Sequence, residues 1–442
     1  GIMSRTTPMG SPKFVSDYAT HMELMNEGTF NSGVSAKYAQ STIDLWRKAN
    51  ADPNGVLAPS GLPNHIAYPN TDWTDWIYSQ NWIQSHNISA VGGSETTTYA
   101  ISGRLFDNPG IMKNTGAKKY ELRTNISTKI GDMITVGTNT FASIENRDKA
   151  AVPTLYNFLR QSTPGVYPMY EGKFGGAVAS EESVQLNNLL QYLYDPRGMD
   201  KVSNFNSTLF ANVNLMKGLT FETKLNYQTR FREETANSMP SDKYNFATNT
   251  IVFPGTTTAN LTLSQSFNKD YTVTIDNVLR YQTAIDKHNI GALIGHNEFE
   301  FKYYTFSATK KGVIDPTITN IGTGNEMSDI TGNEYAYGMR SFFGRLNYDY
   351  DGRYLVEFNL RRDGSSKFGK DRQYGTFPSV GLGWNVSREP FMARVEPYFQ
   401  NIKLRGSWGK LGNDRNNADP NLENYFPAKA FYGNTQYSFG GT

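Results

Sequence analysis

The strongest constraint in this sequence is a two-residue alternation of apolar and polar side chains that recurs in paired segments. In one such segment Phe342, Leu346 and Tyr350 share a face, and Arg345 and Asp349 lie on the other. The next dipeptide, at 351–352, is Asp-Gly, which favours a type I′ hairpin turn, and alternation then resumes. Because successive side chains of a strand point to opposite faces of a sheet, this pattern predicts antiparallel hairpins with one apolar and one polar face.

The connections between the predicted strands alternate in length. Short turns are expected near 94–95, 131–132, 217–218, 286–287 and 351–352, and long excursions over 107–117, 148–204, 232–270, 304–333 and 366–373. Such alternation over ten strands is typical of an up-and-down transmembrane barrel, in which short turns are periplasmic and long loops are extracellular. The predicted fold class is therefore all-β, an antiparallel up-and-down transmembrane β-barrel with a few short helices.

Twelve full strands satisfy this alternation. They are predicted at 86–94, 97–106, 119–130, 133–147, 205–216, 219–231, 271–285, 288–303, 334–350, 353–365, 374–388 and 401–411. Segment 258–267 also has strand character, but a spanning strand there would break the alternation, so we assign it to a hairpin inside a long excursion. Segments 12–30 and 41–50 predict short helices, the second capped by Ser41 or Thr42.

Composition excludes several classes of protein. Only 38% of residues are hydrophobic, and no run approaches the roughly 18 apolar residues of a spanning helix. A net charge of +2 gives no field that would indicate nucleic-acid binding. The chain has no cysteine and five scattered histidines, without a catalytic triad, paired catalytic carboxylates or a metal-ligand set, so we expect neither an enzyme nor a metal site. No signal peptide opens the chain, and both ends look abrupt, so we expect a piece of a longer protein.

Several motifs carry a resemblance to a known family. RDGSSKFG (362–369), GTFPSVGLGWNVSREPF (375–391) and LRGSWGKLGN (404–413) follow in order, and DWTDWIYSQNWIQSHNISAVGGSETTTY (72–99) precedes them. With these motifs the chain resembles the SusC/RagA family of TonB-dependent outer-membrane transporters of Bacteroidota. Lys367 stands where the family usually has Arg.

The resemblance implies a partial, open barrel over 1–442, about half of a barrel of roughly 22 strands. Residues 6–85 would be mostly an extracellular excursion, with the N-terminal plug and the C-terminal strands missing. It implies an outer-membrane location and TonB-energised import of a glycan or peptide. The partners would be a SusD-like lipoprotein, TonB–ExbB–ExbD acting through the plug, and membrane lipid, without a tightly bound cofactor. The alternatives are a non-transporting barrel, such as an adhesin, and a soluble glycan-binding protein, which the apparent lack of a core disfavours.

On this view the apolar face of the strands contacts lipid, and the opposite face lines a wet lumen. The predicted lipid-facing residues are Val380, Leu382, Trp384, Val386, Tyr354, Val356, Phe358 and Leu360.

Two groups of residues are candidates for ligand binding near the outer mouth. Trp73, Trp76 and Trp82 could stack on sugar rings, or simply pack in the loops, which is the more common use of such residues. Asp363, Ser365 and Ser366 could contact substrate or a lid, or stabilise a turn through side chain–backbone hydrogen bonds, which we favour.

Overall fold

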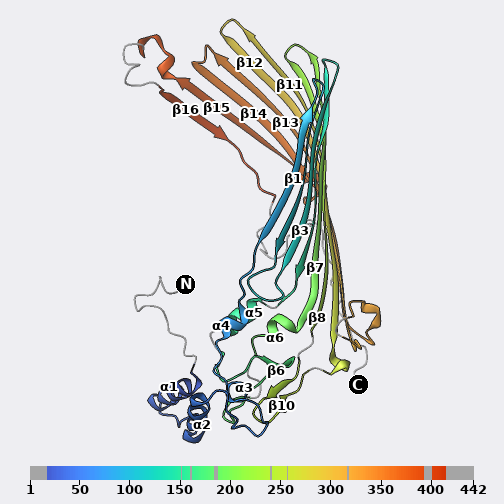
Figure 1. Ribbon diagram of the computed structural model, residues 1–442. Coiled ribbons are helices and arrows are strands. Elements are labelled where there is room, and N and C mark those ends of the chain that lie inside the picture. Colours follow the sequence, from blue (N-terminus) through green and yellow to red (C-terminus); the bar gives the residue numbers. More distant parts are fainter. Residues whose placement is uncertain are drawn as a thin grey trace, which may run out of the picture.

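The computed structural model describes residues 17–150, 152–159, 162–183, 188–238, 241–255, 257–315, 318–392 and 401–414. Twelve strands form one antiparallel sheet in which each strand pairs with the next long strand along the chain. They are β1(Gln84–Gly93), β2(Thr97–Asn108), β3(Ala117–Ile130), β4(Ile134–Asp148), β7(Pro196–Met216), β8(Leu219–Ser238), β11(Thr262–Ile285), β12(His288–Lys311), β13(Glu326–Tyr350), β14(Tyr354–Ser365), β15(Tyr374–Asn385) and β16(Lys403–Gly409). The sheet is tall and curved, and β1 and β16 are its unpaired end strands among the described residues (Figure 1).

All twelve predicted strands are present in the predicted order, which confirms the partial, open up-and-down fold. The prediction for 258–267 was wrong, because residues 262–267 are the first part of β11 and pair with both β8 and β12. β7, β8, β12 and β13 are also longer than predicted, each at its end nearest the long connections. The family resemblance also implies that GIMSRTTP (1–8) is the tail of a preceding barrel strand, and these residues lie outside the described ranges.

The short turns gather at one end of the sheet, at the top of Figure 1. Gly131 and Gly218 have φ of 62° and 81°, values that glycine adopts without steric cost. Asp351 and Gly352 also have positive φ, and the Arg353 N–H donates to the Tyr350 carbonyl at 2.9 Å. This closes the turn that the Asp-Gly pair predicts.

The two faces of the sheet differ in chemistry from β8 to β16. On the outer face, one cross-strand row runs Trp408, Val380, Phe358, Leu346, Ala292, Tyr281 and Leu219. The residues adjacent to these in each strand belong to the inner face. They are polar or glycine, such as Ser407, Gly381, Glu357 and Asn347. The sheet itself therefore buries no continuous apolar layer.

The buried core lies instead at the opposite end, among the long connections. It is built from α1(Tyr18–Asn31), α2(Gln40–Ala51), α3(Asn64–Ala67), α4(Trp73–Ile77), α5(Val152–Leu159), α6(Gln191–Tyr194) and the short strands β5(Met169–Tyr170), β6(Lys173–Gly175), β9(Lys243–Asn245) and β10(Thr250–Phe253). These elements form the lower part of Figure 1. Trp46 of α2 is 1% exposed and packs edge-on against Tyr18 with ring centroids 5.1 Å apart. Among the described helices, none has the length and apolar character needed to cross a membrane.

The prediction of a Ser41 or Thr42 cap on α2 was wrong. Ala39 is the N-cap residue, and its side chain makes no capping bond. The Glu181 carboxylate, from a distant loop, takes that role: it accepts from the Ala39 N–H at 3.1 Å and from the Thr42 hydroxyl at 2.6 Å. A tertiary contact thus replaces the local cap, which sequence alone does not reveal.

Candidate functional site

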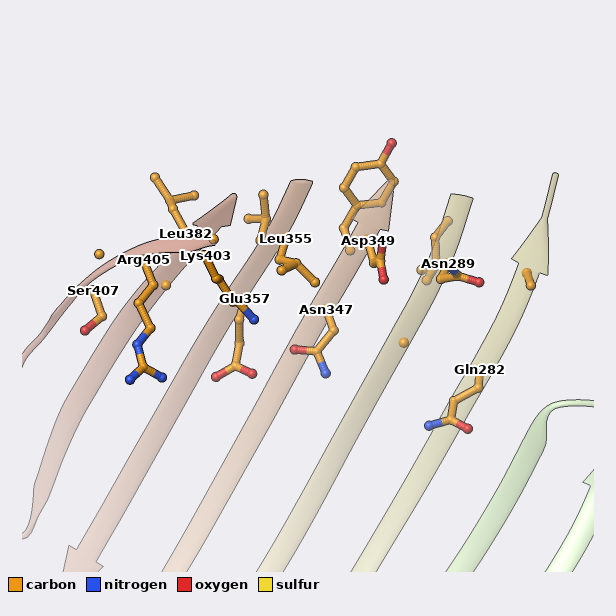
Figure 2. A pocket seen from close by; sticks show the side chains of 18 of the residues that line it. Gln282, Asn289, Asn347, Asp349, Leu355, Glu357, Leu382, Lys403, Arg405 and Ser407 are labelled. Atoms are coloured by element: carbon orange, nitrogen blue, oxygen red, sulfur yellow. The ribbon is translucent and has the colours of Figure 1, made fainter. Parts of the chain in front are cut away.

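A broad hollow of about 1070 Å³ lies on the inner face near the short-turn end of β11–β16. Figure 2 shows its side chains, which include the amides Gln282 and Asn347 and the charged groups Glu357, Lys403 and Arg405. Gly291 and Gly381 leave room over the backbone, since a Cβ at either would have no neighbour nearer than 3.8 Å, while the Leu355 side chain covers Gly383. The surface presents hydrogen-bond donors and acceptors of both signs, and it suits a polar surface or solute more than an apolar one.

Nearer the long connections, the inner face carries ion pairs between neighbouring strands. The Arg232 guanidinium donates to both oxygens of Asp200, at 2.7 and 3.0 Å, and also lies 2.9 Å from Glu234. Arg147 on β4 approaches the same Asp200 at 3.8 Å. Two inner-face atoms, Asn212 Oδ1 and Arg280 Nε, are buried and have no hydrogen-bond partner within the described ranges. Arg280 Nε does lie 3.8 Å from a Glu222 carboxylate oxygen, so the charged side chains of this part of the inner face are largely paired with one another.

The predicted lipid-facing residues of β14 and β15 lie side by side on the outer face. Tyr354 pairs with Trp384, Val356 with Leu382, and Phe358 with Val380. Phe358 and Leu382 are 45% and 58% exposed, and Leu360 is exposed in the same band. Val386 departs from the predicted strand, because β15 ends at Asn385 and Val386 begins a single 3₁₀ turn. Contact of this band with lipid stays a prediction.

At the short-turn end, Trp384 of the outer band makes a hydrogen bond to the turn that follows β15. Its indole N–H donates to Glu389 at 3.0 Å, and Glu389 also lies 3.3 Å from Arg353. The Tyr354 hydroxyl is the chief cause that holds the pKa of Glu389 below its usual range, followed by the Trp384 indole. Trp384 and Glu389 of the WNVSREPF motif thus stabilise the turn itself.

The Asp363, Ser365 and Ser366 candidates all make hydrogen bonds within the chain. Both Asp363 oxygens accept from Arg361 Nε, at 2.6 and 2.8 Å. Ser365 is 6% exposed, and its N–H donates to the Gln373 carbonyl at 3.0 Å. The Ser366 N–H donates to the Gly338 carbonyl, and the Gly338 N–H donates back to the Ser366 hydroxyl, both at 2.9 Å. These bonds fit the turn-stabilising alternative, while a ligand contact stays a prediction.

The three candidate tryptophans are not brought together on one surface. Trp73 is 6% exposed, and its indole N–H donates to the Thr163 carbonyl at 2.8 Å. Trp76 is half-buried and packs edge-on against Tyr167 at 5.6 Å. Trp82 is 86% exposed and borders a small hollow at the long-connection end of β1–β4. Of the three, Trp82 offers an open ring face, and stacking on a sugar stays a prediction there.

A buried carboxylate that sequence analysis did not single out organises the helical part of the long-connection end. Glu182 accepts from the hydroxyls of Tyr18, at 2.8 Å, and Tyr38, and lies 3.1 Å from Lys37 Nζ. Burial alone raises the pKa of Glu182, but the hydrogen bonds from Tyr38, Tyr18 and Lys37 outweigh it and lower that pKa. Burial, with the Glu182 charge, raises the pKa of Tyr18. No local sequence pattern links position 182 to positions 18 and 38, so the site could not be found from spacing.

The sequence model of a family described as TonB dependent receptor-like, beta-barrel matches residues 143–442. Among curated relatives, TonB-dependent receptor P26 of Formosa agariphila is 28% identical over 93% of this chain and 41% of its own length. TonB-dependent receptor SusC of Bacteroides thetaiotaomicron is 25% identical over 94% of this chain and 42% of its own length.

Comparison with solved structures also supports the fold. The RagAB peptide transporter superimposes with a TM-score of 0.65 at 21% identity, covering 83% of this chain and 40% of that chain. The present chain therefore spans about two fifths of the length of the relatives it matches.

Proposed function

Because the chain belongs to the TonB-dependent receptor β-barrel family, with SusC among its relatives, we propose that its strands form the wall of an energised outer-membrane importer. The family places the sheet in the outer membrane. The cargo we propose is a large polar nutrient, an oligosaccharide or a peptide, and the role requires no catalytic residue. A rearrangement driven from the inner membrane through TonB would open the path along the inner face.

The observation that carries this proposal is the contrast between the two faces of the sheet. An outer face rich in exposed Leu, Val and aromatic residues suits lipid, and an inner face of amides, glycines and ion pairs suits a wet passage. The short turns would face the periplasm and the long connections the cell exterior.

We further propose that a SusD-like surface lipoprotein binds at the long-connection end. The size of that end supports this: helices α1–α6 and a four-stranded sheet give it its own apolar clusters, one of which contains Tyr18, Met22 and Trp46. Because these buried clusters hold the long connections in a fixed conformation, the surface of that end is preorganised, which lowers the entropic cost of binding a protein partner.

The test is uptake by cells of the native host that carry or lack the full-length gene. Fluorescent oligosaccharides and peptides of several sizes are supplied, with and without a protonophore. Energy-dependent uptake of one cargo class that is lost with the gene supports import and identifies the class. Unchanged uptake of every cargo, with loss of surface adhesion instead, would favour a non-transporting barrel.

A further inference from the structure

The β12–β13 hairpin extends past its neighbour on one side. β13 pairs with β12 from Glu326 to Tyr350, but β14 pairs with β13 only from Met339 onward. Residues 326–338 of β13 therefore have a strand on one side and, within the described part of the chain, no strand on the other. Every residue from 326 to 334 is exposed.

The hydrogen bonds of Gly338 show which backbone groups face this free edge. Its N–H and C=O both bond to Ser366, on the side away from β12. In an antiparallel strand every second residue directs both groups to the same side, so Ile330, Gly332, Glu334 and Ala336 direct theirs to the free edge as well. That edge offers four donors and four acceptors in one row, and no described residue pairs with them.

Aromatic pairs keep this extension ordered without a third strand. Tyr303 and Tyr335 stack across the hairpin with centroids 4.8 Å apart, and Phe301 lies 5.6 Å from Tyr337. The Lys367 ammonium sits 4.6 Å over the Tyr337 ring. Such cross-strand pairs contribute beyond simple burial, and a two-stranded hairpin is otherwise marginal in water. The edge is thus held in strand conformation.

This edge lacks two of the residue types that usually prevent strand addition. Residues 326–338 contain no proline and no lysine, both of which commonly protect edges. Their charged side chains are Glu326, Asp329 and Glu334, all acidic. Glu334 lies on the outer face and Asp329 on the inner face, so negative charge flanks the edge on both sides.

We propose that a partner protein adds an extended strand with basic side chains to the β13 edge over Ile330–Ala336. A strand of about seven residues would cover this length, roughly 24 Å. The register shift at Thr309/Lys310 ends the regular edge just beyond Ile330.

The negative charge of the β13 edge and the number of its main-chain hydrogen bonds indicate what kind of partner binds there. A second copy of the same edge would place like charges opposite one another, which opposes pairing. Up to eight main-chain hydrogen bonds favour a long-lived contact, which suits a stable partner better than a cargo that must move on. The proposal rests on the orientation given under the proposed function, with the long connections outside the cell.

The test uses a single cysteine, because the chain has none of its own. Full-length Ile330→Cys is expressed in the native host, and intact cells receive a short thiol-to-amine cross-linker whose products are mapped by mass spectrometry. We expect a cross-link to a lysine within an extended segment of another protein. Thr248→Cys, exposed at the same end but away from the edge, should not give that product.

A matched pair of variants isolates the main-chain contribution in the Ile330→Cys background. Glu334→Pro removes an N–H from the free edge and spares the bonds to β12, while Glu334→Gln removes only the charge. We expect the cross-link yield to fall about tenfold for proline and a few-fold for glutamine. Heat-modifiable gel migration checks that both variants fold.

Cross-links to a second copy, to a cargo peptide or to the same chain would each overturn the proposal, as would no cross-link or equal yields for the proline and glutamine variants. Uptake is not the readout, so a failed cross-link in cells that still import leaves the proposed function standing.

Discussion

Phe358 lies at the centre of the outer apolar band and provides the sharpest test of which face contacts lipid. It is four residues from Tyr354, where β14 begins, and four residues from Arg362, a charged residue on the same face. At about 3.3 Å per residue and a strand tilt of about 40°, either boundary is about 10 Å away along the membrane normal. Phe358→Arg therefore places a charge near the midplane, which costs about 2–4 kcal/mol.

That cost corresponds to a decrease of about 30- to 700-fold in the folding equilibrium. The assay is urea titration of the full-length protein in phospholipid vesicles, followed by tryptophan fluorescence and heat-modifiable gel migration. Gly381→Arg is the matched control, because it adds the same charge to the inner face of the neighbouring strand. The nearest atom to a Cβ there is Glu357 Cβ at 4.0 Å, so the new side chain has room and an acidic neighbour. Equal losses for the two variants, or a larger loss for Gly381→Arg, would refute the assignment of the faces.

Three further predictions follow from the ends of the sheet. Thr248→Cys should react with a membrane-impermeant maleimide on intact cells and Lys217→Cys only after permeabilisation; the opposite pattern would invert the topology. Glu182→Gln should lower the free energy of local opening of α1 by about 1–3 kcal/mol, measured as faster amide hydrogen exchange at pH 7, because the buried acceptor of two tyrosines and a lysine loses its charge. The pKa of Glu182 is lowered by folding, so its stabilisation is present above about pH 4.5 and lost as pH falls through that lowered pKa; a variant with the wild-type pH dependence would contradict this. At the short-turn end, the urea midpoint of unfolding in vesicles should be highest for wild type, lower for Glu389→Gln and lowest for Glu389→Ala, because glutamine keeps an acceptor for the Trp384 indole and alanine keeps none. Equal midpoints would exclude a role for this contact.

The strands were predictable because a sheet with one apolar and one polar face imposes a local rule on each strand. Tyr354, Val356, Phe358 and Leu360 alternate with polar residues, and the structure places them on one face, so a reader of the sequence needs no tertiary information there. The turns were predictable for the same reason, since Gly131, Gly218 and the Asp351-Gly352 pair are specified by backbone sterics.

The ends of β11–β13 were not predictable because that rule stops where the chain leaves the apolar band. Residues 326–333, EMSDITGN, show no two-residue alternation, and every one of them is exposed. Their strand conformation comes from pairing with β12 and from aromatic contacts near Tyr335. Such contacts join residues about thirty positions apart, which a local pattern does not encode.

The surroundings of the candidate ligand residues were also not predictable from local sequence. Trp73 and Trp76 stood out by residue type, yet their surroundings are set by Thr163 and Tyr167, some ninety positions away. Glu182 did not stand out at all, although three side chains converge on it. At the long-connection end the residue type therefore says less about exposure than it does in the strands.

The apparent lack of a core, which disfavours a soluble protein, is true of the sheet but not of the long connections. Leu155, Leu189 and Leu193 are fully buried there, within a cluster that also holds Trp73. The difference follows from the solvent on each side. A strand between lipid and a wet lumen needs no dry partner layer, so its apolar side chains stay exposed in the isolated chain. The long connections meet water on the outside and must exclude it by packing on one another, as any soluble domain does. One chain of low mean hydropathy can therefore contain a well-packed subdomain, provided that its remaining apolar residues are reserved for lipid.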